Sequence, residues 1–180
     1  KIATPSLQGQ FLITGAVNRD GQSNITVNKD ARIISSNVEV GNGVIHVIDK
    51  ALEVADQTLA ETIDEDPSLS LFAELIRETG WYDTLDEPLT YDQDSISSHV
   101  SVLAQTNEVF QEAGFNTLND LKERYSHLDD PTNPLDSLNL YVDYRIIPEL
   151  DYLADLAVKS VVLTKAPLEV ISVKLASDSL

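Results

Sequence analysis

The sequence predicts an α+β fold, because a β-rich first third is followed by helical periodicity and then by two more short strands. Residues 1–56 contain short apolar segments separated by turn residues. From Gln57 onward the apolar residues recur at helical spacing, and residues 161–175 return to a strand-like composition. We therefore divide the chain into residues 1–56 and residues 57–180.

The first segment is expected to form four strands. Residues 10–15 and 31–40 have a strand-like composition, and residues 24–28 alternate polar and apolar side chains, which is typical of a strand with one buried face. Asp20-Gly21 is a strong hairpin signal between the first two strands. The pattern therefore indicates antiparallel strands joined by short turns.

The fourth strand is expected after a tight turn at Gly41-Asn42-Gly43. The apolar residues that follow the turn are Val44, Ile45, Val47 and Ile48. Such a run predicts a buried strand, which we expect to reach about Leu52. His46 lies within the run, and we expect it to have a structural role through a hydrogen bond to the backbone or to Asp49.

The second segment is expected to be mainly helical. Amphipathic spacing predicts a helix over residues 68–79, with its apolar stripe inward and Gly80 as its C-terminal cap. Further helices are expected at residues 58–63, 107–113 and 117–125. Residues 135–147 are expected to be mostly helical and then extended before Pro148, and residues 152–156 to form a short turn or helix. Strands are expected at residues 100–104, 161–164 and 168–175. The acidic residues 83–98 are expected to form a surface loop.

Charge is distributed unevenly along the chain. The net charge is −18; residues 1–56 hold five Lys or Arg against six Asp or Glu, giving −1, and the remaining residues hold seven against twenty-four, giving −17. This negative field repels nucleic acid and anionic membrane surfaces, and no apolar run is long enough to span a membrane. The charge indicates a soluble surface, or attraction of basic partners or divalent cations.

Three motifs resemble those of fasciclin-like adhesion domains. The run from Asn42 to Leu52 closely resembles the closing motif of that family. Residues 101–110 resemble its opening motif, with Thr106, Asn107 and Phe110 retained, although Gln105 replaces the usual proline. Residues 144–148 are similar to the central Tyr-His-x-Leu-Pro element, with Arg145 in place of the histidine.

This resemblance implies a wedge-shaped β-sandwich of short strands with helices packed at one end. Residues 1–56 correspond to the closing third of such a unit, and residues 57–180 to its opening two-thirds. The chain is then either a piece of a tandem array or one unit in permuted order. Half a sandwich would expose strand edges and an apolar face, so we expect completion within one chain or by strand exchange in a homodimer.

The resemblance also suggests which residues contact a partner. Tyr144 and Arg145 stand where the Tyr-His pair of the family is linked to adhesion, although Arg145 makes integrin binding doubtful. Trp81 and Tyr82 follow the predicted cap at Gly80; they either pack the first helices or form a contact, since such side chains dominate binding hot spots. Asn42, Gly43, His46, Asp49, Thr106, Asn107, Phe110 and Pro148 are expected to be structural. A local ion pair is expected between Asp143 and Arg145.

The sequence offers no pattern for catalysis. There is no cysteine, no Gly-x-Ser-x-Gly elbow, no phosphate-binding loop and no zinc-type histidine spacing. Acidic clusters such as residues 64–66 lack the spacing of an EF-hand, so we expect solvated loops, with no metal and no cofactor. A glycan hydrolase would need two carboxylates in one cleft, which the sequence does not place.

We therefore predict a non-enzymatic adhesion module, located outside the cell or on its surface after removal of an N-terminal leader. Its partners would be proteins or glycans on another cell or in the matrix. The sequences of the motifs resemble those of bacterial surface members of the family more than those of animal members. The alternative is a structural module that assembles by exchange of strands between chains.

Overall fold

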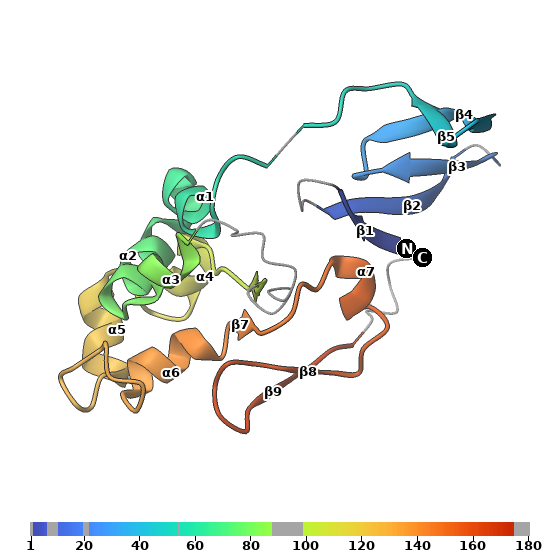
Figure 1. Ribbon diagram of the computed structural model, residues 1–180. Coiled ribbons are helices and arrows are strands. Elements are labelled where there is room, and N and C mark those ends of the chain that lie inside the picture. Colours follow the sequence, from blue (N-terminus) through green and yellow to red (C-terminus); the bar gives the residue numbers. More distant parts are fainter. Residues whose placement is uncertain (1, 7–10, 20–21, 54, 88–98, 175–180) are drawn as a thin grey trace. The chain divides into compact units, whose positions relative to one another are not determined.

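The computed structural model describes residues 2–6, 11–19, 22–53, 55–87 and 99–174. The chain divides into two compact units, Lys1–Asp56 and Gln57–Leu180 (Figure 1). The first unit consists of strands, and the second combines helices with two small antiparallel sheets. The predicted α+β class is therefore confirmed.

The N-terminal unit is a five-stranded antiparallel sheet with the strands in sequence order. Its strands are β1 (Ile2–Pro5), β2 (Phe11–Arg19), β3 (Gln22–Val27), β4 (Ala31–Val40) and β5 (Gly43–Ile48). Asn28 and Lys29 both have a positive φ, which reverses the chain between β3 and β4. The Oδ1 of Asn28 also accepts a hydrogen bond from the N–H of Ile13 at 3.0 Å, so the turn is attached to β2. The predicted Asp20-Gly21 turn lies outside the described residues.

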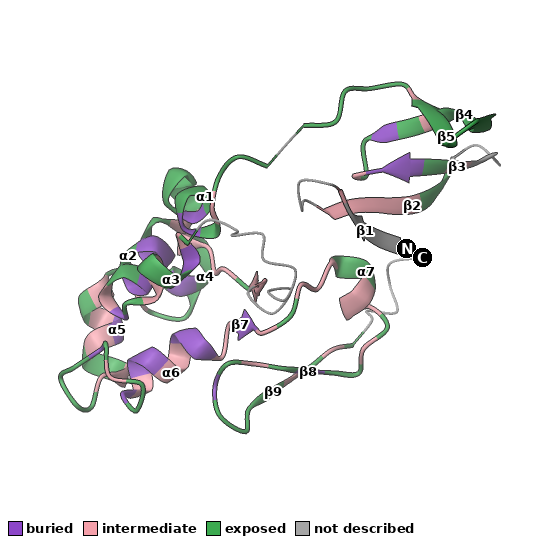
Figure 2. Cartoon of the chain, viewed as in Figure 1, coloured by how far each residue is buried: buried purple, intermediate pink, exposed green. Residues whose placement is uncertain are grey.

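The prediction of a buried strand after Gly43 is wrong in two respects. β5 ends at Ile48 rather than near Leu52. Its side chains are also largely exposed, and Val44 and Ile45 retain 55% and 50% of their accessible surface. The described part of this unit is a single sheet, so it holds no second layer to cover these side chains, and an apolar run alone does not create burial (Figure 2).

The C-terminal unit is built mainly from short helices. In chain order the helices are α1 (Leu59–Glu65), the 3₁₀ turn η1 (Pro67–Leu69), α2 (Ser70–Glu78), α3 (Trp81–Leu85), α4 (Asn107–Glu112), α5 (Leu118–Tyr125), α6 (Ser137–Asp143) and α7 (Leu153–Leu156). Two antiparallel strand pairs accompany them: β6 (Ser101–Val102) with β7 (Ile146–Ile147), and β8 (Val161–Leu163) with β9 (Val170–Ser172).

Helix α2 is the centre of this unit and contacts α1, α3, α4 and α5. Its inward residues Phe72, Leu75 and Ile76 are fully buried, as the helical spacing predicts. They pack with apolar side chains from the other helices and from β7. Figure 2 shows buried positions in purple on α2 and on the elements around it. The buried cluster comprises Ala60, Ile63, Leu71, Phe72, Ala73, Leu75, Ile76, Leu85, Phe110, Leu121, Leu138, Val142 and Ile146.

Side-chain caps fix where most of these helices begin. Thr58 and Thr117 form capping boxes with Glu61 and Asp120, and Thr106 caps α4. Gly80 has φ 77°, the left-handed conformation expected of a residue that ends a helix.

Several boundaries in this unit differ from the predictions. The strand expected over residues 168–175 covers only Val170–Ser172. The expected loop over residues 83–98 begins later, because α3 extends to Leu85; residues 88–98 lie outside the described residues. The helix expected from residue 135 begins at Ser137, because Asp136 caps it. The strand expected over residues 100–104 is reduced to Ser101–Val102.

Candidate functional site

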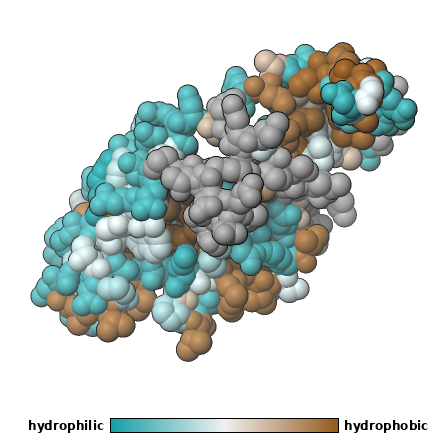
Figure 3. Space-filling view, viewed as in Figure 1, coloured by the Kyte–Doolittle hydropathy of each residue, from teal (hydrophilic) through white to brown (hydrophobic). Residues whose placement is uncertain are grey.

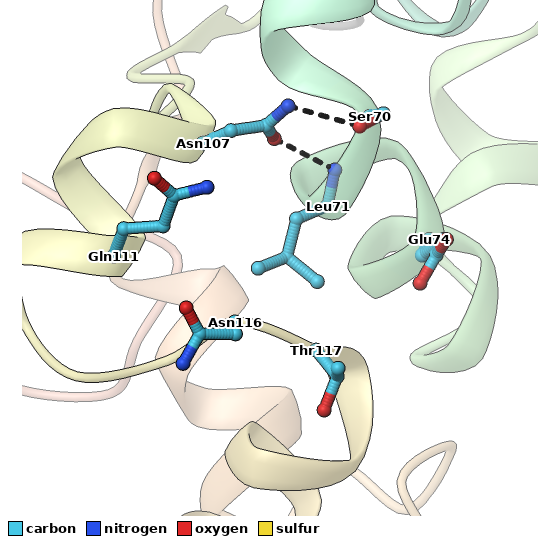
Figure 4. A pocket seen from close by; sticks show the side chains of 7 residues that line it. All are labelled: Ser70, Leu71, Glu74, Asn107, Gln111, Asn116 and Thr117. Atoms are coloured by element: carbon cyan, nitrogen blue, oxygen red, sulfur yellow. Dashed lines mark hydrogen bonds between the residues drawn. The ribbon is translucent and has the colours of Figure 1, made fainter.

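A polar pocket lies where α2, α4 and the start of α5 meet. Asn107, the first residue of α4, joins α4 to the start of α2. Its Oδ1 accepts a hydrogen bond from the N–H of Leu71 at 3.0 Å, and its Nδ2 donates to Ser70 Oγ at 3.0 Å (Figure 4). Its Nδ2 also donates to the Pro67 carbonyl at 3.0 Å. All of the hydrogen-bonding capacity of this amide except one lone pair is therefore used to hold α4 against the start of α2.

The other wall of the pocket is held by Asp120 in α5. Its Oδ2 accepts hydrogen bonds from the N–H groups of Asn116 and Thr117 at 2.8 and 2.9 Å, and Thr117 Oγ1 accepts one from the N–H of Asp120. These backbone hydrogen bonds lower the pKa of Asp120. The rim of the pocket is therefore fixed by hydrogen bonds at both helix starts.

The pocket has a volume of about 200 Å³. It is lined by Ser70, Leu71, Glu74, Asn107, Gln111, Asn116 and Thr117. Leu71 projects between the surrounding polar side chains (Figure 4) and is only 7% exposed, so it supplies an apolar base. Glu74 is the one charged residue of the lining.

A second surface feature is the apolar side of the β4–β5 hairpin. Val38 pairs with Ile45 across the ladder, and alternate residues of a strand point to the same side. Val40 and Val47 therefore share that side with Val38 and Ile45. All four side chains are between 43% and 50% exposed. We call these four residues the hairpin face; hydrophobic residues gather on the surface of this sheet in Figure 3.

The side chains predicted to contact a partner are partly buried, and the structure gives each of them a neighbour within the C-terminal unit. Trp81 packs against the apolar cluster, and its Nε1–H donates a hydrogen bond to Asp143 Oδ1 at 2.8 Å. Burial raises the pKa of Asp143, while the Trp81 hydrogen bond and the charge of Lys165 act in the opposite direction. The ring of Tyr82 lies 4.5 Å from the guanidinium of Arg77.

Arg145 makes a different set of contacts from the one predicted. Its guanidinium lies 3.4 Å from the ring centroid of Tyr141, its Nε donates to Gln105 Oε1 at 2.6 Å, and its NH1 donates to the Tyr141 carbonyl. The expected ion pair with Asp143 is therefore wrong, because Asp143 is held by Trp81. Burial lowers the pKa of Arg145.

Tyr144 and Pro148 flank these contacts. The hydroxyl of Tyr144 donates to the carbonyl of Val170 in β9 at 3.3 Å, so this side chain connects the end of α6 to the β8–β9 pair. Pro148 is half-buried just after β7. A single contact patch formed by Trp81, Tyr82, Tyr144 and Arg145 stays a prediction.

The residues expected to be structural lie mostly at turns and caps. Phe110 is buried in the core. Asn42 and Gly43 stand at the exposed β4–β5 turn. His46 is exposed, and its Nδ1 accepts a hydrogen bond from the N–H of Asn37 at 3.3 Å. Of the two predicted partners of His46, the backbone and Asp49, the structure therefore shows the backbone. The partner of Asp49 is Arg32 rather than His46. The carboxylate of Asp49 accepts hydrogen bonds from the backbone N–H and from the Nε of Arg32.

Sequence reasoning missed the pocket, because it is made by residues from three separate elements. Glu74, Gln111 and Asn116 each look like ordinary solvent-facing positions in the sequence. The available signal was the position of Asn107 at the first turn of a helix, where a side-chain amide can bind a neighbouring backbone. That signal predicts the contact to α2 but not the hollow beside it.

Neither a metal centre nor a membrane span is found in the part of the chain that the structure describes. Within the described ranges, no three His, Asp or Glu side chains are grouped closely enough to hold a metal ion. In the same residues, no helix has both the length and the apolar character required to cross a bilayer.

Comparison with known proteins finds a family match for the first segment. Residues 1–54 match the family model of the Fasciclin domain, which confirms the resemblance of the closing motif; domains of this family are generally cell adhesion modules. The chain is also similar to the structure of a FAS1 domain pair from the insect cell adhesion molecule Fasciclin I, with 15% identity and a TM-score of 0.44. That match covers 94% of this chain but only 56% of the other. A comparison with curated proteins gave no match.

Proposed function

We propose, starting from the match of residues 1–54 to the family model of the Fasciclin domain, that this chain is a non-enzymatic adhesion module. It acts outside the cell or on its surface and binds a partner on another cell or in the matrix. The observation that carries the proposal is the hairpin face, which lies within the segment that matches the family. The family's general role in adhesion supports binding rather than catalysis.

The hairpin face has the character of a contact surface. Its four β-branched side chains have few rotamers to lose when a partner covers them. Covering apolar side chains that are about half exposed releases free energy in proportion to the area removed from water. The N-terminal unit carries a net charge of only −1, so long-range repulsion is small there. These properties favour a protein partner at this face.

The proposal is tested by an attachment assay with the full chain immobilised on a surface. The variant Ile45→Ser with Val47→Ser removes half of the hairpin face, and we expect it to reduce cell or matrix attachment several-fold. The matched control is Val44→Ser, because Val44 is on the same strand, is similarly exposed and points to the opposite side. Equal loss in both variants, or no loss in either, would refute a role for this face.

The alternative function is assembly by exchange of strands between chains. It is favoured by the position of β5, which is an edge strand of the sheet and contains neither Lys nor Pro to prevent pairing. The C-terminal unit also has exposed apolar side chains on β8 and β9, at Val161, Leu163 and Val170. A homodimer formed by such exchange would show a mass that rises with concentration above 19.8 kDa in light scattering. A constant monomer mass would remove this alternative and leave the adhesive one.

A further inference from the structure

We propose that the pocket between α2, α4 and the start of α5 binds one neutral pyranose ring, such as the terminal residue of a glycan. This inference deepens the proposed adhesive function, and rests on it, by naming a ligand class for a second site, in the other unit of the chain. It depends on different residues from the hairpin face, so the two proposals can fail separately.

The side chains around the pocket have unused hydrogen-bonding capacity. The side chains of Glu74, Gln111 and Asn116 make no hydrogen bond or ion pair within the described parts of the chain. Together they offer two carboxylate oxygens, two amide oxygens and two NH₂ groups. Ser70 and Thr117 add hydroxyl groups that act as acceptors in the structure and keep their own protons to donate. Mixed donors and acceptors of this kind match the hydroxyls of a sugar, each of which both donates and accepts.

The charge of the pocket lining excludes an anionic ligand. The lining contains no Lys, Arg or His. The N–H groups that could have bound an anion are already occupied, because Asn107 takes that of Leu71 and Asp120 takes those of Asn116 and Thr117. The low pKa of Asp120 keeps a negative charge beside the rim. A phosphate, a sulfate or an acidic sugar would be repelled here.

The pocket lining is poorly suited to a metal ion. Ca²⁺ takes six to eight oxygen ligands, usually including several carboxylates, whereas this lining provides the single carboxylate of Glu74. A carboxylate among neutral amides is instead suited to accepting hydrogen bonds from two adjacent hydroxyls, and such charge-assisted bonds are the strong ones.

The size and the preorganised walls of the pocket suit a single ring. A volume of about 200 Å³ is below the roughly 300–1,000 Å³ of pockets for drug-sized ligands, so it admits a single ring. The apolar side chain of Leu71 gives the ring's C–H groups a surface to pack on. The walls are held by the hydrogen bonds of Asn107 and Asp120, so little ordering is needed when a ligand enters.

The test is an NMR titration of the full, ¹⁵N-labelled chain with the methyl glycosides of glucose, mannose and galactose. We expect at least one of them to shift the side-chain NH₂ signals of Gln111 and Asn116 and the backbone N–H signals of Leu71 and Thr117. The titration should be saturable and give a dissociation constant on the order of 1–10 mM, the range of a small polar ligand with few contacts.

Two variants make the assignment specific. Gln111→Ala and Asn116→Ala are changes that leave the backbone caps intact, and each should weaken binding by about fivefold, the value of one lost hydrogen bond. Asn119→Ala is the matched control, because Asn119 binds Glu123 along α5 and does not line the pocket. It should bind the sugar as the unaltered chain does.

Three results would overturn the proposal. The first is an absence of shifts with all three glycosides at about 50 mM, well above the expected dissociation constant. The second is binding that survives unchanged in both alanine variants. The third is a response of the same signals to methylammonium, Ca²⁺ or inorganic phosphate but not to sugar, which would assign the pocket to an amine, a cation or an anion.

Discussion

Replacing Trp81 by Phe tests whether this side chain serves the fold. In the structure its Nε1–H donates a hydrogen bond to Asp143, a residue that is only 9% exposed. Phe keeps an aromatic ring against the core but offers no donor. The variant therefore leaves a buried carboxylate without this donor, and we expect the C-terminal unit to be destabilised without a change in its fold.

The size of the effect depends on pH, because the acceptor is titratable. A hydrogen bond to a charged group contributes about 1.5–3 kcal/mol, and one to a neutral group about 0.5–1.5 kcal/mol. Burial raises the pKa of Asp143 in the folded chain. The stability that Asp143 contributes is therefore fully present below its pKa in the unfolded chain, 3.8, and is lost as pH rises through its pKa in the folded chain. Without Trp81 the pKa of Asp143 rises further, and the loss is larger. The deficit should be about 2–3 kcal/mol near neutral pH and about 1 kcal/mol below a pH of roughly 3.8.

The assay is urea unfolding followed by far-UV circular dichroism, because the substitution removes the only tryptophan of the chain and with it the usual fluorescence signal. The unaltered chain and the variant are compared at both pH values, so that other titrating groups cancel. Asp143→Asn is the companion change: it keeps an acceptor for Trp81 but cannot ionise, and in that background the deficit should no longer depend on pH. Unchanged stability of Trp81→Phe at both pH values would refute the structural role and favour a surface contact.

Three further predictions concern other parts of the chain. Asp136 caps α6 and is fully buried, and hydrogen bonds from the N–H groups of Leu128 and Leu138 lower its pKa although burial acts to raise it. Asp136→Ala should lower the free energy of unfolding in urea by about 2–3 kcal/mol near neutral pH. This loss of stability should shrink as pH falls below roughly 3.8. Ile45→Asp should lower the thermal midpoint by only a few degrees, because the site is half exposed, and complete unfolding would mean that β5 is buried in solution. In a double-mutant cycle, Gln105→Pro and Arg145→His should show a coupling of about 1 kcal/mol or more, and strict additivity would contradict their contact.

Most helices of the C-terminal unit could be predicted because they are specified locally, whereas α3 (Trp81–Leu85) was not predicted. Thr58, Thr106 and Thr117 are capping residues at the expected starts, and Gly80 ends α2 with the positive φ that its lack of a side chain permits. The inward stripe of α2 follows from spacing alone. Such signals act over three or four residues, so one sequence is sufficient to find them.

The polar pocket could not be predicted in the same way. Ser70, Asn107 and Thr117 come from separate segments of the chain, and their proximity depends on how α2, α4 and α5 pack. Burial also depends on packing. The residues of β5 have the composition of a core strand, yet composition does not tell which layer, if any, covers them.

The contact between Gln105 and Arg145 shows how structure changes the meaning of a sequence difference. Each residue departs from the fasciclin-like motifs, one from a proline and the other from a histidine, and in the sequence the two differences look independent. In the structure Gln105 Oε1 accepts hydrogen bonds from Arg145 Nε and from the hydroxyl of Tyr141. The guanidinium of Arg145 also stacks on the ring of Tyr141. A histidine could not supply the planar set of donors that lets one side chain make the bond and the stack together, and a proline would offer no acceptor. The two differences therefore form one interaction that joins α6 to the segment after β6, and a substitution at either position is best understood through its effect on the other.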